Sequence, residues 1–505
     1  MSSLSVLVPV FNEQHLVAAS LGRLAVLEGS PHLDRLQVIV VDDSSRDGTP
    51  AALSAFAAER GIALAPPPPA APRAGTGAVP AVELGRGRHG KTDWIFLRHE
   101  RNGGKGTAIR TALSRADGEY SVIHDADLEY HPRDVLRMVE VFVQEKADAV
   151  FGSRFAGGGA RRVLLFRHEL GNRLLTFLTN LMTNLNLTDM ETCYKAVRTD
   201  LLQSLPLVSN DFRLEPELTI KLAKREARIF EVPISYSGRT YQEGKKIGWR
   251  DGFRALGAIL RFSFSDDVYI RDEHGSQMLG RLARAHRFNG WMADLIRPFL
   301  GSKLLEIGSG TGTLTRQLVP RDVYVASDVN PIYLKTLENL TSDRPYLAAR
   351  YTDVTDLASY PRLEGGFDSV VCLNVIEHVD DDVAALRNIR TVLAPGGRAI
   401  VLVPQGPWNF GTLDVVLGHR RRYTEDALRR VAAEAGLEVK EILRFNRVSS
   451  LPWWLNGRLL RKKSFGLLQI KIVDWITPIS RVVDRFLPFP PLSLIAVLER
   501  RADGK

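Results

Sequence analysis

Acidic residues occur at three places in the first half of the chain, each at the end of a short apolar run. Glu13 ends VPVFNE, Asp42 and Asp43 follow VIVV, and Asp125 and Asp127 stand in VIHDADLEY. Alternate residues of an extended segment point the same way, so Asp125 and Asp127 can face one divalent cation together. Such a cation would neutralise a diphosphate leaving group.

A glycine-rich segment, RNGGKGTAIRTAL, opens a helix-like run and contains Lys105. Its backbone N–H groups and the lysine could bring positive charge to a phosphate. The simpler alternative is that acids at strand ends only cap the following helices or lie in solvent-exposed turns. Three acidic clusters in register favour a binding site.

Short apolar runs alternate with helix-like stretches in this half, which predicts an α/β fold with a mostly parallel sheet. The predicted strands are residues 5–9, 36–41, 94–97 and 120–123. In such a sheet, ligands bind at the carboxyl ends of the strands, where the acidic clusters stand. Residues 65–90 are rich in Pro, Ala and Gly and include four consecutive prolines, so we expect an extended surface insertion there.

Seven motifs then follow one another in the order typical of one enzyme family: VPVFNE, VVDDSSRDGT, NGGKGTAIRTAL, HDADLEY, FGSRF, LTDMETCYK and EVPISY. With them, residues 4–265 resemble the family 2 glycosyltransferases of GT-A fold, in particular the dolichyl- or polyprenyl-phosphate sugar synthases. The resemblance implies an inverting, metal-dependent transfer of a sugar from a nucleotide sugar to a polyprenyl phosphate. It places the donor nucleotide at Pro9, Glu13, Asp42, Asp43, Lys105 and Asp125, and Mg²⁺ or Mn²⁺ at Asp127 and Glu129.

A lipid monophosphate is already an anionic nucleophile, so basic residues need only position it and no general base is required. Arg154 is the catalytic candidate beside Asp125 and Asp127, and Arg167 is a second phosphate ligand; the alternative for each arginine is a solvated surface cation. A phosphate-clamping loop is predicted at Arg239, Lys245 and Lys246.

If the acceptor were a sugar hydroxyl, a carboxylate base would be needed, and Asp189 or Glu191 stands where the wider family keeps one. That alternative describes a glycosyltransferase that extends a polysaccharide. It stays open at the level of the sequence.

Two apolar helical faces, at residues 174–185 and 253–264, are candidates for contact with a membrane surface. For the first we expect burial against the sheet instead, whereas for the second, which carries Arg250, Arg254 and Arg261, both interpretations stand. No run reaches the roughly 18 apolar residues of a membrane span, so we expect peripheral contact only.

The second half contains LLEIGSGTGTLTRQL, in which an apolar strand, a glycine-rich turn and a helix follow one another. The turn has the spacing G-x-G-x-G rather than the G-x-G-x-x-G of a dinucleotide loop. The preceding acid, Glu306, suits a cofactor with an amino group and a sulfonium, and Asp328 stands where a carboxylate usually binds ribose. Further strands are predicted at residues 304–307, 323–326, 369–373 and 399–403 and form a second doubly wound sheet.

Residues 300–405 resemble class I methyltransferases that use S-adenosylmethionine, through this loop and through YTDVTD, FDSVVCLNVIEHV and VLAPGGRAIVLVP. The resemblance implies a Rossmann-like fold. It places the cofactor at Glu306, Gly308, Gly310, Asp328, Asp353, Val354 and Asn374. The alternative is an NAD-type or ligand-free Rossmann domain.

The methyl acceptor is less clearly marked. His378 in NVIEHV is a candidate general base for an oxygen nucleophile, and a structural histidine is the alternative. The run GHRRRYT, residues 418–424, is either an anion site or a solvated basic loop.

Bulk composition agrees with two soluble enzymes in one chain. The length of 505 residues requires more than one hydrophobic core. We predict a glycosyltransferase domain at 1–264, a helical connection at 265–300 and a methyltransferase domain with a C-terminal extension at 301–505.

The net charge of +9 favours anionic ligands or a membrane surface, and no nucleic-acid motif accompanies it. Cys193 and Cys372 form no metal or disulfide pattern, which favours the cytoplasm, with peripheral contact at the inner face of the membrane. We expect a bifunctional enzyme whose methyl acceptor is a glycan, a lipid-linked intermediate or a related small molecule. The alternative makes one half a binding module, and the oligomeric state is left open.

Overall fold

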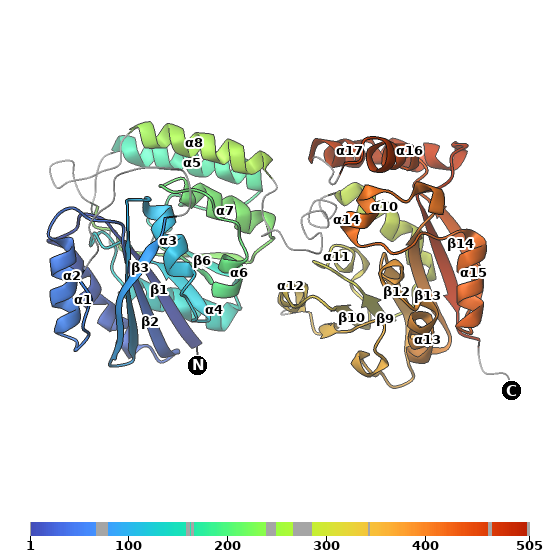
Figure 1. Ribbon diagram of the computed structural model, residues 1–505, viewed down its shortest axis with the longest axis horizontal. Coiled ribbons are helices and arrows are strands. Elements are labelled where there is room, and N and C mark those ends of the chain that lie inside the picture. The colour runs from blue at the N-terminus through green and yellow to red at the C-terminus, as the bar shows by residue number, and fades with distance from the viewer. Residues whose placement is uncertain are drawn as a thin grey trace. The chain divides into compact units, whose positions relative to one another are not determined.

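The computed structural model divides into two compact units, Met1–Ile270 and Arg271–Lys505, each built around its own β-sheet (Figure 1). This confirms the predicted α/β fold with two domains. The residues that the structure describes are 2–66, 79–157, 162, 166–238, 249–265, 285–341, 344–462 and 467–501.

An eight-stranded mixed sheet forms the centre of the first unit, in the order β3-β4-β2-β1-β5-β7-β6-β8. The neighbours β4, β2, β1 and β5 are parallel, as predicted, whereas β3 and β7 run antiparallel to the strands beside them. The strand bounds are β1 Ser2–Val10, β2 Leu33–Asp42, β3 Ala81–His89, β4 Thr92–His99, β5 Tyr120–Ile123, β6 Ala149–Ser153, β7 Lys195–Arg198 and β8 Ile229–Pro233.

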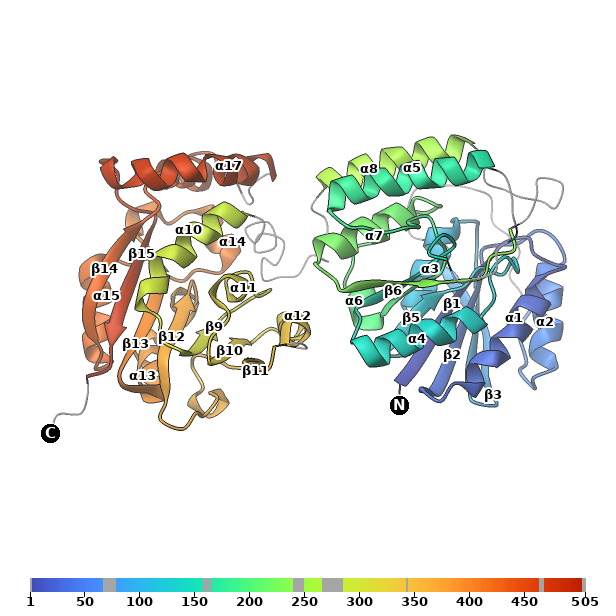
Figure 2. The same ribbon diagram turned by 180° about the vertical axis from the view of Figure 1, so that it is seen from behind.

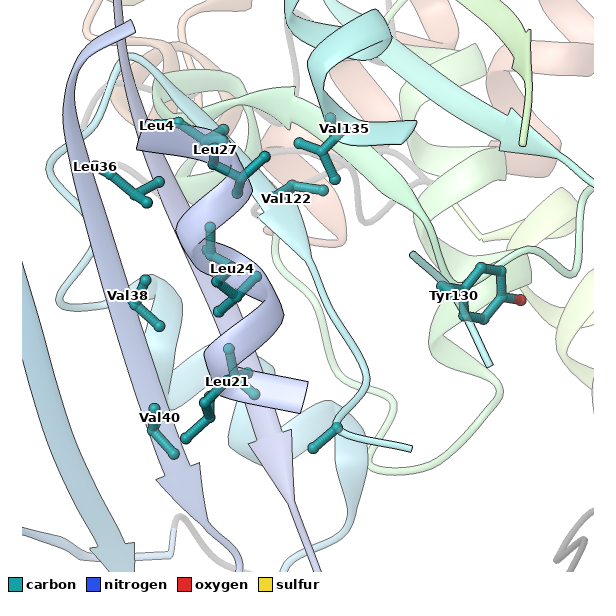
Figure 3. Close-up of a cluster of buried hydrophobic side chains, with 14 of the residues drawn as sticks. Leu4, Leu21, Leu24, Leu27, Leu36, Val38, Val40, Val122, Tyr130 and Val135 are labelled. Carbon is teal, nitrogen blue, oxygen red and sulfur yellow. The ribbon is translucent and has the colours of Figure 1, made fainter. Parts of the chain in front are cut away.

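Helices cover both faces of this sheet because its central strands are apolar on both sides. Leu4, Val6 and Val8 of β1 pack in one hydrophobic cluster with α1, α2 and α4, and Leu7 packs in the other with α3, α6 and α7. Figure 3 shows Leu21, Leu24 and Leu27 lying over the strands in the first cluster. The helix bounds are α1 Val17–Arg23, α2 Thr49–Ala58, α3 Lys105–Leu113, α4 Arg133–Glu145, α5 Phe166–Thr183, α6 Thr199–Gln203, α7 Leu214–Lys224 and α8 Trp249–Phe264.

Part of the expected surface insertion, residues 65–90, forms the edge strand β3, which pairs antiparallel with β4. The sequence did not indicate this strand because glycines interrupt it. They have a packing reason: a Cβ on Gly85 would lie 2.5 Å from the carbonyl oxygen of Ala63, and one on Gly87 would lie 2.8 Å from Ile62. Residues 67–78 lie outside the described part of the chain.

Helix α5 contradicts the expectation that its apolar face is buried. Leu174 and Leu181 are 57% and 67% exposed, whereas Thr176 and Thr179 on the opposite side are 4% and 0% exposed. The hydroxyls satisfy this inverted arrangement locally, because Thr179 donates to the carbonyl of Leu175 and Thr176 accepts from the backbone of Met190. The helix therefore turns Leu174 and Leu181 outward, while Leu175 is partly buried against a small hydrophobic cluster.

The second unit has a seven-stranded sheet in the order β11-β10-β9-β12-β13-β15-β14. Its first five strands are parallel, and β15 and β14 close the edge in antiparallel pairing. The strand bounds are β9 Lys303–Ile307, β10 Val323–Asp328, β11 Leu347–Tyr351, β12 Phe367–Leu373, β13 Leu393–Pro404, β14 Glu438–Phe445 and β15 Ser493–Glu499.

Helices again lie on both sides of this sheet, with α13 and α15 on one hydrophobic cluster and α10, α11 and α12 on the other (Figure 2). Trp291 and Ile296 of α10, in the predicted helical connection 265–300, pack in the core of this unit; residues 266–284 of the connection lie outside the described ranges. The helix bounds are α10 His286–Ile296, α11 Thr315–Leu318, α12 Pro331–Thr341, α13 Asp382–Val392, α14 Thr412–Leu417, α15 Glu425–Glu434, α16 Ser450–Trp454 and α17 Leu467–Val483.

Candidate active sites

The acidic clusters of the first unit meet at one edge of the sheet. Strands β1, β2 and β5 are parallel neighbours, and Val10 at the end of β1 is in register with Asp42 at the end of β2. Pro9 lies inside β1, one residue before its end. The loops that carry Glu13, Asp43 and Asp125 therefore leave the sheet on the same side, as the sequence predicted.

Asp43 organises the glycine-rich turn that precedes α3. Its carboxylate accepts hydrogen bonds from the backbone of Gly103 at 2.8 Å and of Gly104 at 2.7 Å, and from the side-chain amide of Asn102 at 2.8 Å. The ring Nδ1 of His99 lies 2.6 Å from the same carboxylate. Asp43 thus shapes the glycine-rich turn, and its direct contact with a nucleoside stays a prediction.

Asp42 is likewise engaged within the protein. Its carboxylate accepts from the backbone of Ser45 at 3.0 Å and pairs with the buried guanidinium of Arg98. Glu13 is positioned through its backbone, which donates to the hydroxyl of Thr49 at 2.9 Å.

Lys105 occupies the centre of this edge. Its Nζ lies 2.9 Å from Oδ2 of Asp125 and 3.2 Å from Oε1 of Glu215 on α7, and the other oxygen of Glu215 lies 3.0 Å from Nζ of the buried Lys195. Burial opposes ionisation of Asp125, but the Lys105 ammonium outweighs it and lowers the pKa of that carboxyl. A continuous row of alternating charges thus joins the D-x-D loop to α7.

Glu215 and Lys195 were not identified from the sequence. Lys195 is the first residue of β7 and Glu215 lies in the first turn of α7, and only the fold brings them to the acidic edge. The thiol of Cys193, 3.2 Å from Lys105 Nζ, belongs to the same cluster.

The two residues expected at the cation lie on the loop after β5. Oδ1 of Asp127 accepts from the backbone N–H of Glu129 at 3.1 Å, and Oε2 of Glu129 accepts from the hydroxyl of Tyr236 at 3.0 Å. Oxygen ligands of this kind suit Mg²⁺ or Mn²⁺. The residues present therefore fit a hard divalent cation.

Arg154 forms a bidentate pair with the fully buried Asp189. Its Nε and Nη2 lie 2.7 and 2.8 Å from the two carboxylate oxygens, and its guanidinium lies 5.2 Å from the ring centroid of Tyr236. The backbone N–H of Arg154 donates to the same carboxylate at 3.0 Å, so Asp189 accepts three hydrogen bonds from this arginine. Tyr236, beside the Arg154 guanidinium, donates to Glu129. Asp189 thus holds Arg154 near the loop of Asp127 and Glu129, the predicted cation loop. This geometry suits Asp189 as a positioning group for the arginine.

Glu191 is the other carboxylate considered as a base. Burial raises the pKa of Glu191 to about 7, and its buried Oε1 has no hydrogen-bond partner among the described residues. Of the two acids in LTDMETCYK, Glu191 has the properties of a proton acceptor near neutral pH.

Four predicted phosphate ligands cannot be placed. The side chain of Arg167 and the whole of Arg239, Lys245 and Lys246 lie outside the described part of the chain.

In the second unit, the glycine-rich turn follows β9 as predicted. Gly308 has a φ of 74°, and a Cβ there would lie 2.4 Å from Cγ2 of Val375. Gly310 has a φ of 54°, which favours glycine through backbone conformation. Its N–H donates to Oδ2 of Asp328 at 2.8 Å, so two predicted cofactor residues are in direct contact.

Glu306 lies beneath this turn rather than on its surface. Its Oε2 accepts from Thr315 at 2.6 Å and from Tyr324 at 2.7 Å, and burial raises the pKa of its carboxyl. Glu306 therefore braces the turn, and its role at the methionine part of the cofactor stays a prediction. Burial also raises the pKa of Asp328, whose Oδ1 accepts from the backbone of Asn330.

The remaining cofactor candidates follow β11 and β12. Asp353 accepts from the backbone and hydroxyl of Thr355, and Asn374 is exposed in a left-handed conformation directly after β12. The side chain of Val354 packs in the hydrophobic core, so any ligand contact of this residue would involve its backbone.

His378 stands beside Glu377 and His419 near the end of β12. Its Nδ1 lies 3.1 Å from the carbonyl oxygen of Gly418, and its ring centroid lies 5.0 Å from that of His419. Burial, followed by the neighbouring His419, lowers the pKa of His378.

The three arginines of GHRRRYT form ion pairs with acidic residues of the same unit. Arg420 pairs with Asp380, Arg421 lies 3.1 Å from Asp382, and Arg422 lies 2.8 Å from Asp414. Arg422 is buried in its ion pair, whereas Arg420 and Asp380 are exposed, and the anion site and the solvated loop both stay predictions.

Comparisons with known proteins assign each unit to an enzyme class. The family model described as "Glycosyl transferase family 2" matches residues 5–65 and 86–205, and the one described as "Methyltransferase domain" matches residues 305–399. The first match leaves out most of the predicted insertion.

Two curated relatives are similar to this chain over about half to three fifths of its length. A dodecaprenyl-phosphate galacturonate synthase of Rhizobium johnstonii is 26% identical over 61% of this chain and 79% of its own length. An undecaprenyl-phosphate mannosyltransferase of Micrococcus luteus is 28% identical over 48% of this chain and 86% of its own.

Among solved structures, a glucosyl-3-phosphoglycerate synthase from Mycobacterium tuberculosis aligns with a TM-score of 0.37 at 18% identity, over 54% of this chain and 82% of its own. A putative methyltransferase of Haloferax volcanii, in complex with an activator, aligns with a TM-score of 0.33 at 19% identity, over 46% and 99%. From the family matches and the arrangement of the two sheets, we conclude that the chain joins a family 2 glycosyltransferase domain of GT-A fold to a Rossmann-like methyltransferase domain.

Proposed function

We propose that the first unit transfers a sugar from a nucleotide sugar to a polyprenyl phosphate. The relatives' names specify polyprenyl phosphates, and the observation in this chain that carries the proposal is the outward apolar face of α5. This helix ends six residues before Asp189, which holds Arg154 beside the cation loop. A lipid acceptor and its phosphate-binding arginine would therefore meet at one end of the helix.

The charges of this site agree with an inverting, metal-dependent transfer. Asp127 and Glu129 would hold Mg²⁺ or Mn²⁺, which neutralises a departing diphosphate. The ammonium of Lys105 lies next to the D-x-D loop and adds positive charge at the donor. A phosphate acceptor is already anionic, so this reaction needs positioning rather than proton removal.

For the second unit we propose transfer of a methyl group from S-adenosylmethionine to a hydroxyl of a glycan or lipid-linked product. The turn around Gly308 and Gly310 and the carboxylates of Asp328 and Asp353 fit such a cofactor, which supplies an electrophilic methyl group when bound. Asp328 would orient ribose hydroxyls, because a carboxylate at the end of the second strand of such a sheet commonly does so.

Both units present apolar helices to the outside, which supports peripheral association with a membrane. On α17 of the second unit, Trp475 and Ile479 are exposed while Thr477 and Ser480 are buried, the same inverted pattern as on α5. Apolar patches of this kind on a soluble fold mark interaction surfaces. Among the described helices, none is both long and apolar enough to span a bilayer.

A hydroxyl acceptor is the second candidate function of the first unit, and the raised pKa of Glu191 is the observation that favours it. That reaction would extend a polysaccharide. The two candidates differ in whether Glu191 must accept a proton.

The acceptor is tested by incubating the full chain with a panel of nucleotide sugars, Mn²⁺ or Mg²⁺ and polyprenyl phosphate, and following product masses. We expect a gain of one sugar unit on the lipid. Because a phosphate nucleophile needs no base, Glu191→Gln is expected to keep its turnover within about threefold, whereas loss of a general base costs roughly 10²- to 10⁴-fold. No sugar on the lipid, or a loss of that size in the variant, would refute the proposal.

Lys105→Met tests the row of buried charges. The change leaves the carboxylates of Asp125 and Glu215 without their shared cation, so we expect the first unit to lose about 3 kcal/mol of stability and the chain to lose sugar transfer. Urea unfolding monitored on the first unit's transition measures the stability. The control Lys91→Met removes an exposed lysine and should change it by less than about 0.5 kcal/mol; equal effects of the two variants would contradict the assignment.

Asp328→Asn tests the cofactor assignment in the second unit. The amide has one acceptor oxygen and no charge, so the affinity for S-adenosylmethionine is expected to fall by about 10- to 100-fold, measured by isothermal titration calorimetry. The matched control Asp322→Asn changes an exposed acid just before β10. An unchanged affinity in Asp328→Asn would remove this residue from the site.

Leu181→Glu tests membrane contact through α5. A leucine that enters a lipid interface contributes about 1.5–3 kcal/mol, so binding to anionic vesicles should weaken by roughly 10-fold or more in a flotation assay. Val143→Glu on α4, where Val143 is 43% exposed, makes the same chemical change elsewhere on the first unit. If both variants float like the unaltered protein, α5 is not the contact surface.

A further inference from the structure

Glu377, His378 and His419 form a cluster that the assigned cofactor site does not use. Glu377 and His378 lie in the short helix η4, Ile376–His378, and His419 follows α14. One potential ligand atom from each of the three lies within 4.8 Å of the others, and Nε2 of His419 is 3.9 Å from Oε1 of Glu377. Two segments some forty residues apart in sequence therefore converge on one point.

Both histidines have one ring nitrogen engaged by the protein. Nδ1 of His419 lies 2.9 Å from Oδ1 of Asp414, and Nδ1 of His378 lies 3.1 Å from the carbonyl oxygen of Gly418. Asp414 is itself fixed by Arg422 at 2.8 Å and by the backbone of Gly411 at 2.9 Å. Metal-binding histidines are oriented in this way, with a carboxylate or carbonyl on one nitrogen and the metal on the other.

Glu377, unlike the two histidines, has no hydrogen-bond partner for its side chain among the described residues. This side chain is 0% exposed. A buried carboxylate without partners is strongly unfavourable. A cation shared with the two imidazoles would supply the missing partner.

We propose that Glu377, His378 and His419 bind a divalent transition-metal cation in the methyltransferase unit. Two imidazoles and one carboxylate form a ligand set that suits Zn²⁺ and related borderline cations and leaves a coordination position open. Neighbouring ligands of a tetrahedral cation lie about 3.4 Å apart, so binding would draw the three side chains together by roughly 1 Å.

The position of the cluster suggests what the open coordination site binds. Val375, two residues before Glu377, touches the cofactor turn at Gly308. The cation is thus beside the proposed methyl donor, and we assign its open position to the hydroxyl of the methyl acceptor. This second step rests on the proposed methyl transfer, whereas the cation site itself does not.

A cation-bound hydroxyl loses its proton more readily, and the proton passes to solvent. The oxygen then forms a bond to the methyl carbon while the carbon–sulfur bond breaks, and the neutral thioether leaves. His378 is a ligand in this scheme rather than the general base considered from its sequence position. The acceptor class is a hydroxyl compound, because a metal-bound oxygen is what the site activates.

Metal binding is tested on the full chain with Zn²⁺ by calorimetry and with Co²⁺ by visible absorption. Nitrogen ligands at low coordination number give Co²⁺ stronger absorption than the oxygen ligands of Asp127 and Glu129, so the two sites are distinguished. We expect Glu377→Gln and His419→Ala each to abolish this absorption and to weaken Zn²⁺ binding by at least about tenfold. The control His286→Gln, an exposed histidine at the start of α10, should change neither signal.

Folding and cofactor binding are measured in the same variants. Without metal, Glu377→Gln should melt at or above the temperature of the unaltered protein, because the neutral amide needs no counter-ion, and Zn²⁺ should stabilise only the unaltered protein. Affinity for S-adenosylmethionine should stay within about twofold in both. If a variant fails to fold, His378→Gln, at a partly exposed ligand, replaces it.

The outcomes separate the cation site from the proposed function. Absence of the Co²⁺ signal in the unaltered protein, or its persistence in Glu377→Gln and His419→Ala, overturns the cation site. Metal binding together with methyl transfer that is unaffected by chelation keeps the site and refutes its role at the acceptor. Failure to bind S-adenosylmethionine with metal binding intact refutes the proposed methyl transfer alone.

Discussion

The ammonium of Lys105 lies between the carboxylates of Asp125 and Glu215, and the polar edge of the first unit is built around this contact. Each of the three groups is largely removed from water, so none could stay charged there alone. The D-x-D loop, the start of α3 and the helix α7 are therefore held in one arrangement. The turn before α3 is held a second time by Asp43, which accepts hydrogen bonds from the backbone of Gly103 and Gly104.

The second unit also contains buried acids that need partners, and it supplies them with hydrogen bonds rather than with a lysine. Glu306 and Asp328 are buried acids whose oxygens accept hydrogen bonds from the glycine-rich turn and the elements around it. Glu377 is buried as deeply but is not satisfied in this way. A protein tolerates such a group where a ligand supplies the missing interaction, which is why we propose a cation at Glu377.

The sequence predicted the strands and the acids at their ends because both signals are local. A strand such as β1 is apolar on both faces, and a carboxylate that follows it must leave at the edge of the sheet. Lys195 and Glu215 could not be found in this way, since their significance comes from pairing across the fold. The same holds for His419, which is one basic residue in GHRRRYT until the chain folds it against Glu377.

Helix α5 shows the limit of periodicity most clearly. The spacing of Leu174 and Leu181 correctly indicated one apolar face, but periodicity does not say which side that face turns to. Burial of Thr176 and Thr179 against the protein settles the direction, and the cost of burying hydroxyls is offset by local hydrogen bonds. An apolar face kept outside in this way raises the free energy of the protein in water, and this cost is the reason that we propose a lipid surface as the partner of α5.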